Sequence, residues 1–432
     1  MKRRDFLSAV AAPGLLAGLA PALEAASRLG AFQPAPDDSD AAVFAEARKH
    51  FLIAPGVAYC NTGTLGACPI EVVTALVDGN RNIERFLADW PYEKADGEPL
   101  TGYQELKDVR ALAGSLINAT ADEIAITQNA TMGMSMVANG LELSAGDEVV
   151  STNQEHAGGI SGWRLRAKRH GVVVKEVALE GPLDSGPDGI VKAFAAAITP
   201  RTKVVMFSHI TSGLGVLMPA KELCALARER GALAIIDGAQ AVGQIPVDVK
   251  ALGADAYVAS PHKWLMAPKG TGILYISRDV QDRVWSTLAS SHWDDHASGA
   301  FRFMQYGTGS VPVSDGLVAA LRFVQKIGVE RIARWDRMLT MRLRDRLERI
   351  PAARLSSPSD RRLASAITTF RVDGMTAKAL QDALWARKIR VRAQGDARGV
   401  RLSAHMYVMP AEIDAVLSVV GSSAPGRQVA VA

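Results

Sequence analysis

The chain has 432 residues, of which 48% are hydrophobic and 22% are charged. That length allows two to three domains and a large core, and the composition is ordinary for a soluble globular protein. The net charge is only +4 and no basic stretch is interleaved with aromatic residues, which argues against nucleic-acid binding. The three cysteines (Cys60, Cys68 and Cys224) form no C-x-x-C pair, so we expect neither a disulfide framework nor a metal site.

Residues 1–26 are expected to be an export signal, because they combine a basic start, an apolar stretch and small residues near a plausible cleavage point. Arg3–Arg4, followed by Asp-Phe-Leu, resembles the twin-arginine signal, which implies recognition by the twin-arginine export machinery and a periplasmic location. The apolar run is short and interrupted by proline and glycine, so no stable membrane insertion is expected. A disordered basic tail or an uncleaved anchor is the alternative. Residues 27–42, with prolines and aspartates, are expected to be a flexible lead-in.

From residue 43 to 310, short apolar runs rich in β-branched residues alternate with helical stretches. This alternation predicts an α/β domain with a mostly parallel sheet of seven strands covered by helices. Runs such as VVMF and LAII are apolar throughout, as in a sheet buried on both faces. The expected strands are Glu123–Thr127, Glu148–Thr152, Val172–Val177, Lys203–Ser208, Leu233–Asp237, Ala256–Ala259 and Gly272–Ile276, and the helices include Met132–Asn139, Gly159–Arg169, Ile190–Ala197 and Ala220–Arg230.

From residue 311 to 432 the pattern changes to long helices followed by a few strands, which predicts a smaller α+β domain at the C-terminus. No internal repeat or low-complexity segment interrupts this plan. The expected helices are Asp315–Ile327, Arg331–Arg349 and Ala411–Val420, and the expected strands are Ala366–Val372, Ile389–Ala393 and Gly399–Leu402.

Polar side chains follow four of the expected strands at the point where each strand ends. Asp237 ends one strand, and the segments Thr127–Asn129, Ser208–His209 and Ser260–Lys263 follow three others. In an open α/β sheet, ligands bind beyond the carboxyl ends of the strands, so these groups predict a site at one edge. Considered alone, Asp237 also suits a helix N-cap, and Lys263 also suits an exposed loop.

The spacing of two motifs indicates the class of site. Asp237 opens the motif D-G-A-Q, and Lys263 closes the motif S-P-H-K 26 residues later. Together they resemble the class V aminotransferase family of fold-type-I pyridoxal 5′-phosphate (PLP) enzymes, which includes cysteine desulfurases and isopenicillin N epimerase. The resemblance extends from about residue 55 to 421 and implies the PLP-dependent transferase fold (aspartate aminotransferase-like) and an enzyme.

The resemblance implies PLP as cofactor and roles for five residues around its ring. Lys263 would hold the aldehyde of PLP as a Schiff base, and burial would lower its pKa so that it can react as the free amine. Asp237 would keep the pyridine nitrogen protonated, so that the ring can accept electrons. His156 would stack on the ring and Gln240 would bond its phenolic oxygen. Ser212 stands where the family often has an asparagine, and its contact with that oxygen is in doubt.

Other donors would bind the phosphate of the cofactor. The segment T-Q-N-A-T follows a strand and opens a helix, so the amides around Ala130 and Thr131 point toward an anion. By resemblance, Thr131, Ser260 and His262 are phosphate donors. Thr308, in Q-Y-G-T-G-S, would reach the phosphate of the neighbouring subunit, which implies at least a homodimer with shared active sites.

Substrate recognition is expected from the smaller domain. Arg401, in G-V-R-L-S, resembles the family arginine that forks onto a substrate carboxylate, and Arg392 matches another family arginine near the site. Asn61 lies in Y-C-N-T-G, which resembles the entrance segment of the epimerase-like branch. The loop between the arginines lacks the reactive cysteine of desulfurases, so desulfuration by that route is not expected. Cys60 is expected to be a small buried residue rather than a nucleophile.

We therefore expect a PLP enzyme that acts on an amino acid or on an amino group of a larger molecule, by transamination, epimerisation or elimination. Tailoring of a periplasmic secondary metabolite such as a siderophore is one hypothesis. A catalytically inactive scaffold with this fold is the alternative from another class, and a serine hydrolase using Ser208 and His209 lacks the G-x-S-x-G motif. Each site residue also has an ordinary explanation: an N-cap for Thr131, a turn for Thr308, and a surface charge for Arg392.

Overall fold

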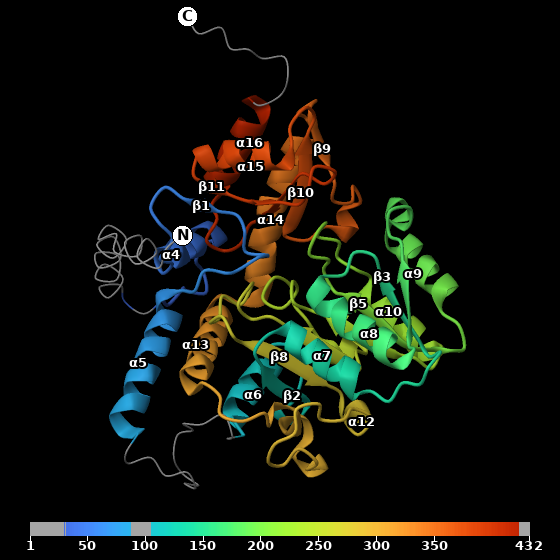
Figure 1. Ribbon diagram of the computed structural model, residues 1–432. Coiled ribbons are helices and arrows are strands. Elements are labelled where there is room, and N and C mark those ends of the chain that lie inside the picture. Colours follow the sequence, from blue (N-terminus) through green and yellow to red (C-terminus); the bar gives the residue numbers. More distant parts are fainter. Residues whose placement is uncertain (1–29, 31, 88–104, 423–432) are drawn as a thin grey trace, which may run out of the picture.

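The computed structural model describes residues 30, 32–87 and 105–422. A large sheet wrapped in helices lies below a smaller sheet with its own helices (Figure 1). The expected export signal at residues 1–26 lies outside the described residues. Within the described part of the chain, no helix is long and apolar enough to cross a membrane.

The large sheet has seven strands in the order β2-β8-β7-β6-β5-β3-β4. Only β8 runs antiparallel to its neighbours, so the carboxyl ends of β3, β5, β6 and β7 lie along one edge. The central strands are buried almost throughout, which explains their unbroken apolar sequences, whereas the edge strand β4 is largely accessible. The predicted fold class is confirmed. The strands are β2 (Ile124–Thr127), β3 (Glu148–Thr152), β4 (Val173–Val177), β5 (Thr202–Ser208), β6 (Leu233–Asp237), β7 (Ala256–Ala259) and β8 (Gly272–Ile276).

Helices that follow the parallel strands begin at this edge and cover the sheet. Helices α7 (Ala130–Gly140) and α8 (Ala157–His170) follow β2 and β3 and pack against each other over the sheet (Figure 1). The Asn129 side chain accepts the Met132 N–H at 2.9 Å, which starts α7 beside the strand end. Helix α8 ends at Gly171, whose φ of 71° favours glycine. The other helices here are α9 (Gly186–Ala197), α10 (Ala220–Glu229), α11 (Val249–Leu252) and α12 (Arg278–Gln281).

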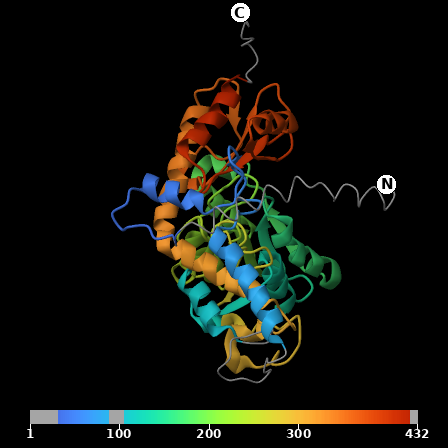
Figure 2. The same cartoon turned by 90° about the vertical axis from the view of Figure 1, so that its left-hand side faces the viewer.

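A second layer of helices connects the two sheets. Helix α13 (Val311–Ile327) packs along α5 (Ile70–Phe86) and against α6 (Lys107–Ser115), and α14 (Val329–Leu347) continues to the small sheet (Figures 1 and 2). The small sheet is antiparallel, with the order β12-β13-β10-β9. Its elements are β9 (Ala353–Leu355), β10 (Ile367–Val372), α15 (Ala377–Ala386), β12 (Arg392–Ala393), β13 (Val400–Ser403) and α16 (Pro410–Ser422).

The N-terminal segment packs on α13, α14 and β11 (Ile389–Arg390), and its residues 63–66 also contact the segments that follow β6 and β7 of the large sheet. The Phe44 ring of α4 (Asp40–Lys49) stacks on Trp335 of α14 with 4.7 Å between centroids, and β1 (Ala58–Tyr59) pairs with β11. The flexible lead-in expected at residues 27–42 stays a prediction, although one described residue of this segment is packed against the fold. Phe32 is buried and stacks on Phe323 at 4.9 Å, because this removes apolar surface from water.

Candidate active site

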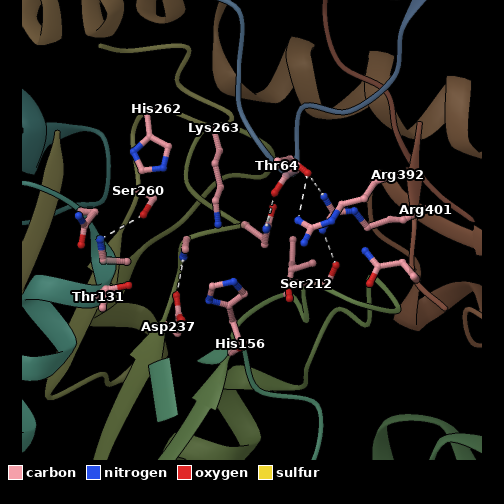
Figure 3. A pocket seen from close by; sticks show the side chains of 18 residues that line it. Thr64, Thr131, His156, Ser212, Asp237, Ser260, His262, Lys263, Arg392 and Arg401 are labelled. Atoms are coloured by element: carbon pink, nitrogen blue, oxygen red, sulfur yellow. Dashed lines mark hydrogen bonds between the residues drawn. The ribbon is translucent and has the colours of Figure 1, made fainter. Parts of the chain in front are cut away.

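A cavity of about 390 Å³ opens where the strand ends of the large sheet face the small sheet (Figure 3). The large sheet contributes the residues that follow β5, β6 and β7 and the first turns of α7 and α8, and the small sheet contributes β12 and β13. Eleven of the thirteen residues expected from the sequence line it: Ala130, Thr131, His156, Ser212, Asp237, Gln240, Ser260, His262, Lys263, Arg392 and Arg401.

Lys263 extends from the turn after β7 into the middle of the cavity (Figure 3). Burial lowers the pKa of its amine to about 8; Asp237 opposes this shift, while Arg401 and Arg392 add to it. Gly66 contacts the backbone of this turn, because its N–H donates to the His262 carbonyl at 2.8 Å. A Cβ on Gly66 would lie 2.0 Å from the Lys263 carbonyl oxygen, so only glycine fits at this approach. The lowered pKa gives this amine a far larger uncharged fraction near neutral pH than an ordinary lysine has, as a nucleophilic lysine requires.

Asp237 and His156 lie on the opposite side of the cavity from the Lys263 backbone (Figure 3). Asp237 is 5% exposed, and its Oδ1 accepts the Ala239 N–H at 2.9 Å. Its Oδ2 lies so close to Gly159 that a Cβ there would come within 2.8 Å. The His156 Nδ1 accepts the Gly158 N–H at 3.0 Å, which fixes the tautomer with hydrogen on Nε2, and desolvation and Lys263 lower the pKa of this ring. A buried carboxylate and a neutral imidazole thus face Lys263.

Four residues form what we call the anion corner: Ala130, Thr131, Ser260 and His262. The Ala130 N–H at the start of α7 donates to the Ser260 Oγ at 3.1 Å, which leaves the hydroxyl hydrogen of Ser260 free to donate. The His262 Nδ1 is buried and has no hydrogen-bond partner in the described structure. A Cβ on Gly158 would lie 2.2 Å from the Thr131 Oγ1, so this glycine makes room for the hydroxyl. Helix N-terminus, hydroxyls and an unpartnered ring nitrogen together suit a phosphate.

Gln240 is held firmly in the cavity wall. Its Nε2 donates to the Gly63 carbonyl at 2.9 Å, and its Oε1 accepts the Trp264 Nε1–H at 2.8 Å. The second hydrogen of Nε2 is the one available to a ligand. The Trp264 carbonyl in turn accepts from His405 Nε2 at 2.9 Å, which ties the turn that follows Lys263 to the segment after β13.

Arg392 and Arg401, which we call the arginine pair, lie on the side opposite the anion corner (Figure 3). Arg401 is buried; its Nη1 donates to the Ser212 carbonyl at 2.8 Å and its Nη2 to the Thr64 Oγ1 at 2.6 Å. Burial, with a contribution from Arg392, lowers the pKa of Arg401 to about 10. Arg392 is exposed, and its Nη1 donates to the same Thr64 hydroxyl at 3.3 Å. The hydrogen bonds of both guanidinium groups go to neutral oxygens, so the pair favours an anion.

Two of the expected residues do not line this cavity. The Asn61 Oδ1 accepts from Thr64 Oγ1 at 2.8 Å and from Arg401 Nη2 at 3.5 Å. Thr308 lines a different cavity, together with Tyr306 and Ser310 at the start of α13. Its expected role at a neighbouring subunit stays a prediction.

The sequence did not single out Thr64 or Glu155. Thr64 directly follows the motif Y-C-N-T-G that contains Asn61, which was the available signal. Glu155 directly precedes His156; its carboxylate accepts from the hydroxyls of Thr152 and Ser208, each at 2.6 Å. Burial, with Asp237 nearby, raises the pKa of Glu155 to about 7.

Two rival chemistries do not fit the geometry. The Ser208 hydroxyl donates to Glu155, while the His209 Nδ1 pairs with the Tyr257 hydroxyl at 2.9 Å, so serine and histidine do not form a nucleophile and its base. Cys60 is fully buried, and burial raises the pKa of its thiol far above the ordinary value. Between β12 and β13 the chain turns within residues 394–399, with no cysteine.

Over residues 100–416 the chain matches the family described as aminotransferase class-V, and it therefore belongs to that family. The isopenicillin N epimerase of Amycolatopsis lactamdurans is 29% identical over 395 residues, which cover 87% of this chain and 97% of that protein. A probable cysteine desulfurase of Mycolicibacterium paratuberculosis is 31% identical over 73% of this chain, but the match spans only 45% of that longer protein. A mutant of the protein C-DES, with glycine covalently linked to its PLP cofactor, has a TM-score of 0.77 at 24% identity, covering 87% of this chain and 98% of that one.

Class V enzymes use PLP, and the expected family, fold and cofactor are confirmed. The cavity fits this group on observations independent of the comparisons. The anion corner has an unpartnered, buried His262 nitrogen for the phosphate, and Lys263 presents an amine of lowered pKa for the aldehyde. Asp237 lies buried on the far side, where a carboxylate can balance a pyridinium nitrogen.

Proposed function

We propose that this PLP enzyme acts at the amine-bearing carbon of an amino acid, or of an amino group within a larger molecule, by transamination, epimerisation or elimination. The observation that carries the proposal is the Lys263 amine, which has a pKa near 8 and lies between a buried carboxylate, an anion corner and an arginine pair. No simple structural role requires all four in one cavity.

Different residues of the chain would bind the cofactor, move the proton and orient the substrate. The cofactor, when bound, supplies a carbonyl for the substrate amine and a ring that accepts electron density from the adjacent carbon. Lys263 would take and return the proton at that carbon, because its lowered pKa lies close enough to neutral pH for the amine to accept and release a proton there. Asp237 would stabilise positive charge on the ring, and the anion corner would hold the phosphate, as Ser260 and His262 keep donors free. Arg401 would orient a substrate carboxylate.

Several features favour an epimerase-like or aminotransferase-like reaction over desulfuration. The isopenicillin N epimerase of Amycolatopsis lactamdurans is matched over 97% of its length, whereas the probable cysteine desulfurase of Mycolicibacterium paratuberculosis is matched over 45%. The short turn at residues 394–399 offers no thiol near the arginine pair. The cavity is also bordered by the exposed Arg392, which leaves an open side for a substrate larger than a free amino acid.

Export and assembly complete the proposal. The twin-arginine-like Arg3–Arg4 supports export of the folded protein to the periplasm, where it would tailor a peptide-derived metabolite such as a siderophore. Thr308 would complete the active site of a second copy in a homodimer. Size-exclusion chromatography with light scattering tests the assembly, and fractionation of cells with an Arg3→Lys/Arg4→Lys variant as control tests the export.

Spectroscopy tests the chemistry most directly. The purified protein should absorb in the visible range, and borohydride should fix the cofactor to the peptide that contains Lys263. Lys263→Ala should lose this label, whereas Lys378→Ala, at an exposed lysine paired with Asp382, should keep it. A colourless protein without a label would overturn the proposal. Deuterium exchange at the α-carbon of candidate amines, followed by product analysis, then separates the three reactions.

A further inference from the structure

The arginine pair consists of directly opposed positions on neighbouring strands. In the antiparallel register of β12 and β13, Arg392 is the partner of Arg401. Such positions share one face of the sheet, with Cβ atoms about 5 Å apart, and like charges there repel each other. Neither guanidinium has a carboxylate partner among residues 30, 32–87 and 105–422. The fold therefore keeps two like charges close together, and an anion between or beside the two guanidinium groups would remove this electrostatic repulsion.

Thr64 holds both groups toward the cavity. Its Oγ1 accepts from Arg401 Nη2 at 2.6 Å and from Arg392 Nη1 at 3.3 Å, and its own hydrogen goes to the Asn61 Oδ1 at 2.8 Å. This threonine belongs to the N-terminal segment, more than 300 residues from either arginine. One neutral hydroxyl thus fixes two cations without neutralising either.

The charges that line the cavity are unequal. Lys263, Arg392 and Arg401 face a single carboxylate, Asp237, and the neutral and weakly basic groups of the anion corner already suit the cofactor phosphate. One substrate carboxylate pairs well with one guanidinium, because the two planar groups match in a bidentate arrangement. The second guanidinium then remains without a counter-charge.

We propose that the substrate carries two anionic groups beside its amine, one for Arg401 and one for Arg392, and that Arg392 selects for the second. This inference rests on the proposed function, because it concerns the same cavity. The buried Arg401 takes the anionic group nearer the reacting carbon. The exposed Arg392 takes the outer group, which can be a second carboxylate or another anion of similar size.

The test compares reagents that differ by one charge. Oxyamines condense with an enzyme-bound PLP carbonyl whether or not they resemble the natural substrate. We would measure how fast 2-(aminooxy)succinate and its 4-carboxamide remove the visible absorption band at low ionic strength. The dicarboxylate should reach the same rate at roughly tenfold lower concentration, since a charge-assisted hydrogen bond to the exposed Arg392 has about that effect. Calorimetry with glutarate and glutaramate should show the same contrast without any reaction at the cofactor.

Variants assign the contrast to a residue. Arg392→Gln should reduce the ratio between the two reagents to less than about twofold, since the exposed charge that reads the second group is gone. Arg390→Gln is the matched control, because Arg390 lies on the preceding strand, stacks over Trp385 at 3.9 Å and does not line the cavity. Thr64→Val should lower the ratio between the two reagents, whereas Thr64→Ser, which keeps the hydroxyl, should retain it.

Each outcome decides something different. Equal reaction of both reagents, or a ratio that survives in Arg392→Gln, overturns the two-anion proposal and leaves the proposed function intact. Loss of the ratio in Arg390→Gln as well would assign it to general surface charge and also overturn the proposal. If neither reagent removes the band and Lys263 carries no cofactor, the proposed function fails first.

Discussion

The charge balance around Lys263 yields a prediction with opposite signs for two substitutions. The pKa of this amine is lowered from 10.5 to about 8, chiefly by burial, and the neighbouring charges contribute to that net shift. Asp237 favours the charged amine, whereas Arg392 and Arg401 disfavour it. Asp237→Asn should therefore lower the pKa of Lys263 below 8, and Arg392→Gln should raise it.

The magnitude follows from the fraction of free amine. With a pKa of about 8, roughly 9% of Lys263 is uncharged at pH 7, against about 0.03% for an ordinary lysine. Asp237→Asn can therefore increase the reactivity of Lys263 at pH 7 by at most about tenfold, because the whole population is then uncharged. Retention of PLP should weaken in the same variant, because the carboxylate that faces the ring nitrogen is lost.

Competitive labelling measures this pKa without the cofactor. The apoprotein would be treated with trace acetic anhydride between pH 6 and 11, and acetylation of the Lys263 peptide would be compared with that of Lys378 in the same digest. Asp294→Asn, at an exposed carboxylate away from the cavity, serves as the matched control. A midpoint near 10.5 in the parent protein, or an upward shift in Asp237→Asn, would refute the reasoning.

Three further substitutions test parts of the site. Glu155→Gln should flatten the pH dependence of the free energy of unfolding. The pKa of Glu155 is raised to about 7 in the folded protein, so the folded carboxyl keeps its proton at pH values where the unfolded one has lost it. In the parent protein, stability should therefore fall by up to about 3 kcal/mol between pH 4.5 and 8, as urea titrations would show. Gly66→Ala should cost about 1–3 kcal/mol because its Cβ meets a backbone carbonyl at 2.0 Å, whereas Gly181→Ala, with nothing within 4 Å, should not; equal thermal melting of the two would contradict the packing argument. His405→Gln should lower the free energy of unfolding by about 3–5 kcal/mol, because it leaves the buried Asp336, 2.8 Å from His405 Nδ1, without its partner. Adding Asp336→Asn should recover part of this loss, as measured by chemical denaturation.

The large sheet could be predicted from the sequence because its strands carry their signal locally. Leu233–Asp237 is a run of apolar residues with a polar end, and its limits in the structure are those expected. Such runs fit only a strand covered on both faces. The four connecting helices named from the sequence also exist, with ends that differ by a few residues where caps such as Asn129 begin the helix earlier.

Elements defined by tertiary packing were not predicted. Helix α5 (Ile70–Phe86) begins after Pro69 without a side-chain cap, and its main contact is α13, about 240 residues later. The packing of Phe32 in the N-terminal segment was not predicted for the same reason. Phe32 looks like one aromatic residue in a polar stretch, and only the fold supplies Phe323 and His50 as its partners.

The same distinction holds for the site: residues with a signal in the sequence were predicted, and residues defined by tertiary contacts were not. Lys263 and Asp237 were identified because two motifs at a characteristic spacing resemble a known family, and both line the cavity. Thr64 was missed because its importance lies in bonds to residues more than 300 positions away. Glu155 was missed because a carboxyl with a pKa near neutrality depends on burial, which a sequence pattern does not reveal.

The turn between the arginines connects these observations. Gln394 N–H donates to the Gly399 carbonyl at 2.8 Å, and Gly399 has a φ of 87° with the Phe370 carbonyl 2.1 Å from where a Cβ would lie. A connection this tight cannot carry a mobile nucleophile to the cavity, and it brings Arg392 and Arg401 onto directly opposed positions. The feature that argues against a protein thiol in the reaction therefore also creates the paired cations. On the two-anion proposal, the group that occupies the space beside the amine comes from the substrate and is anionic.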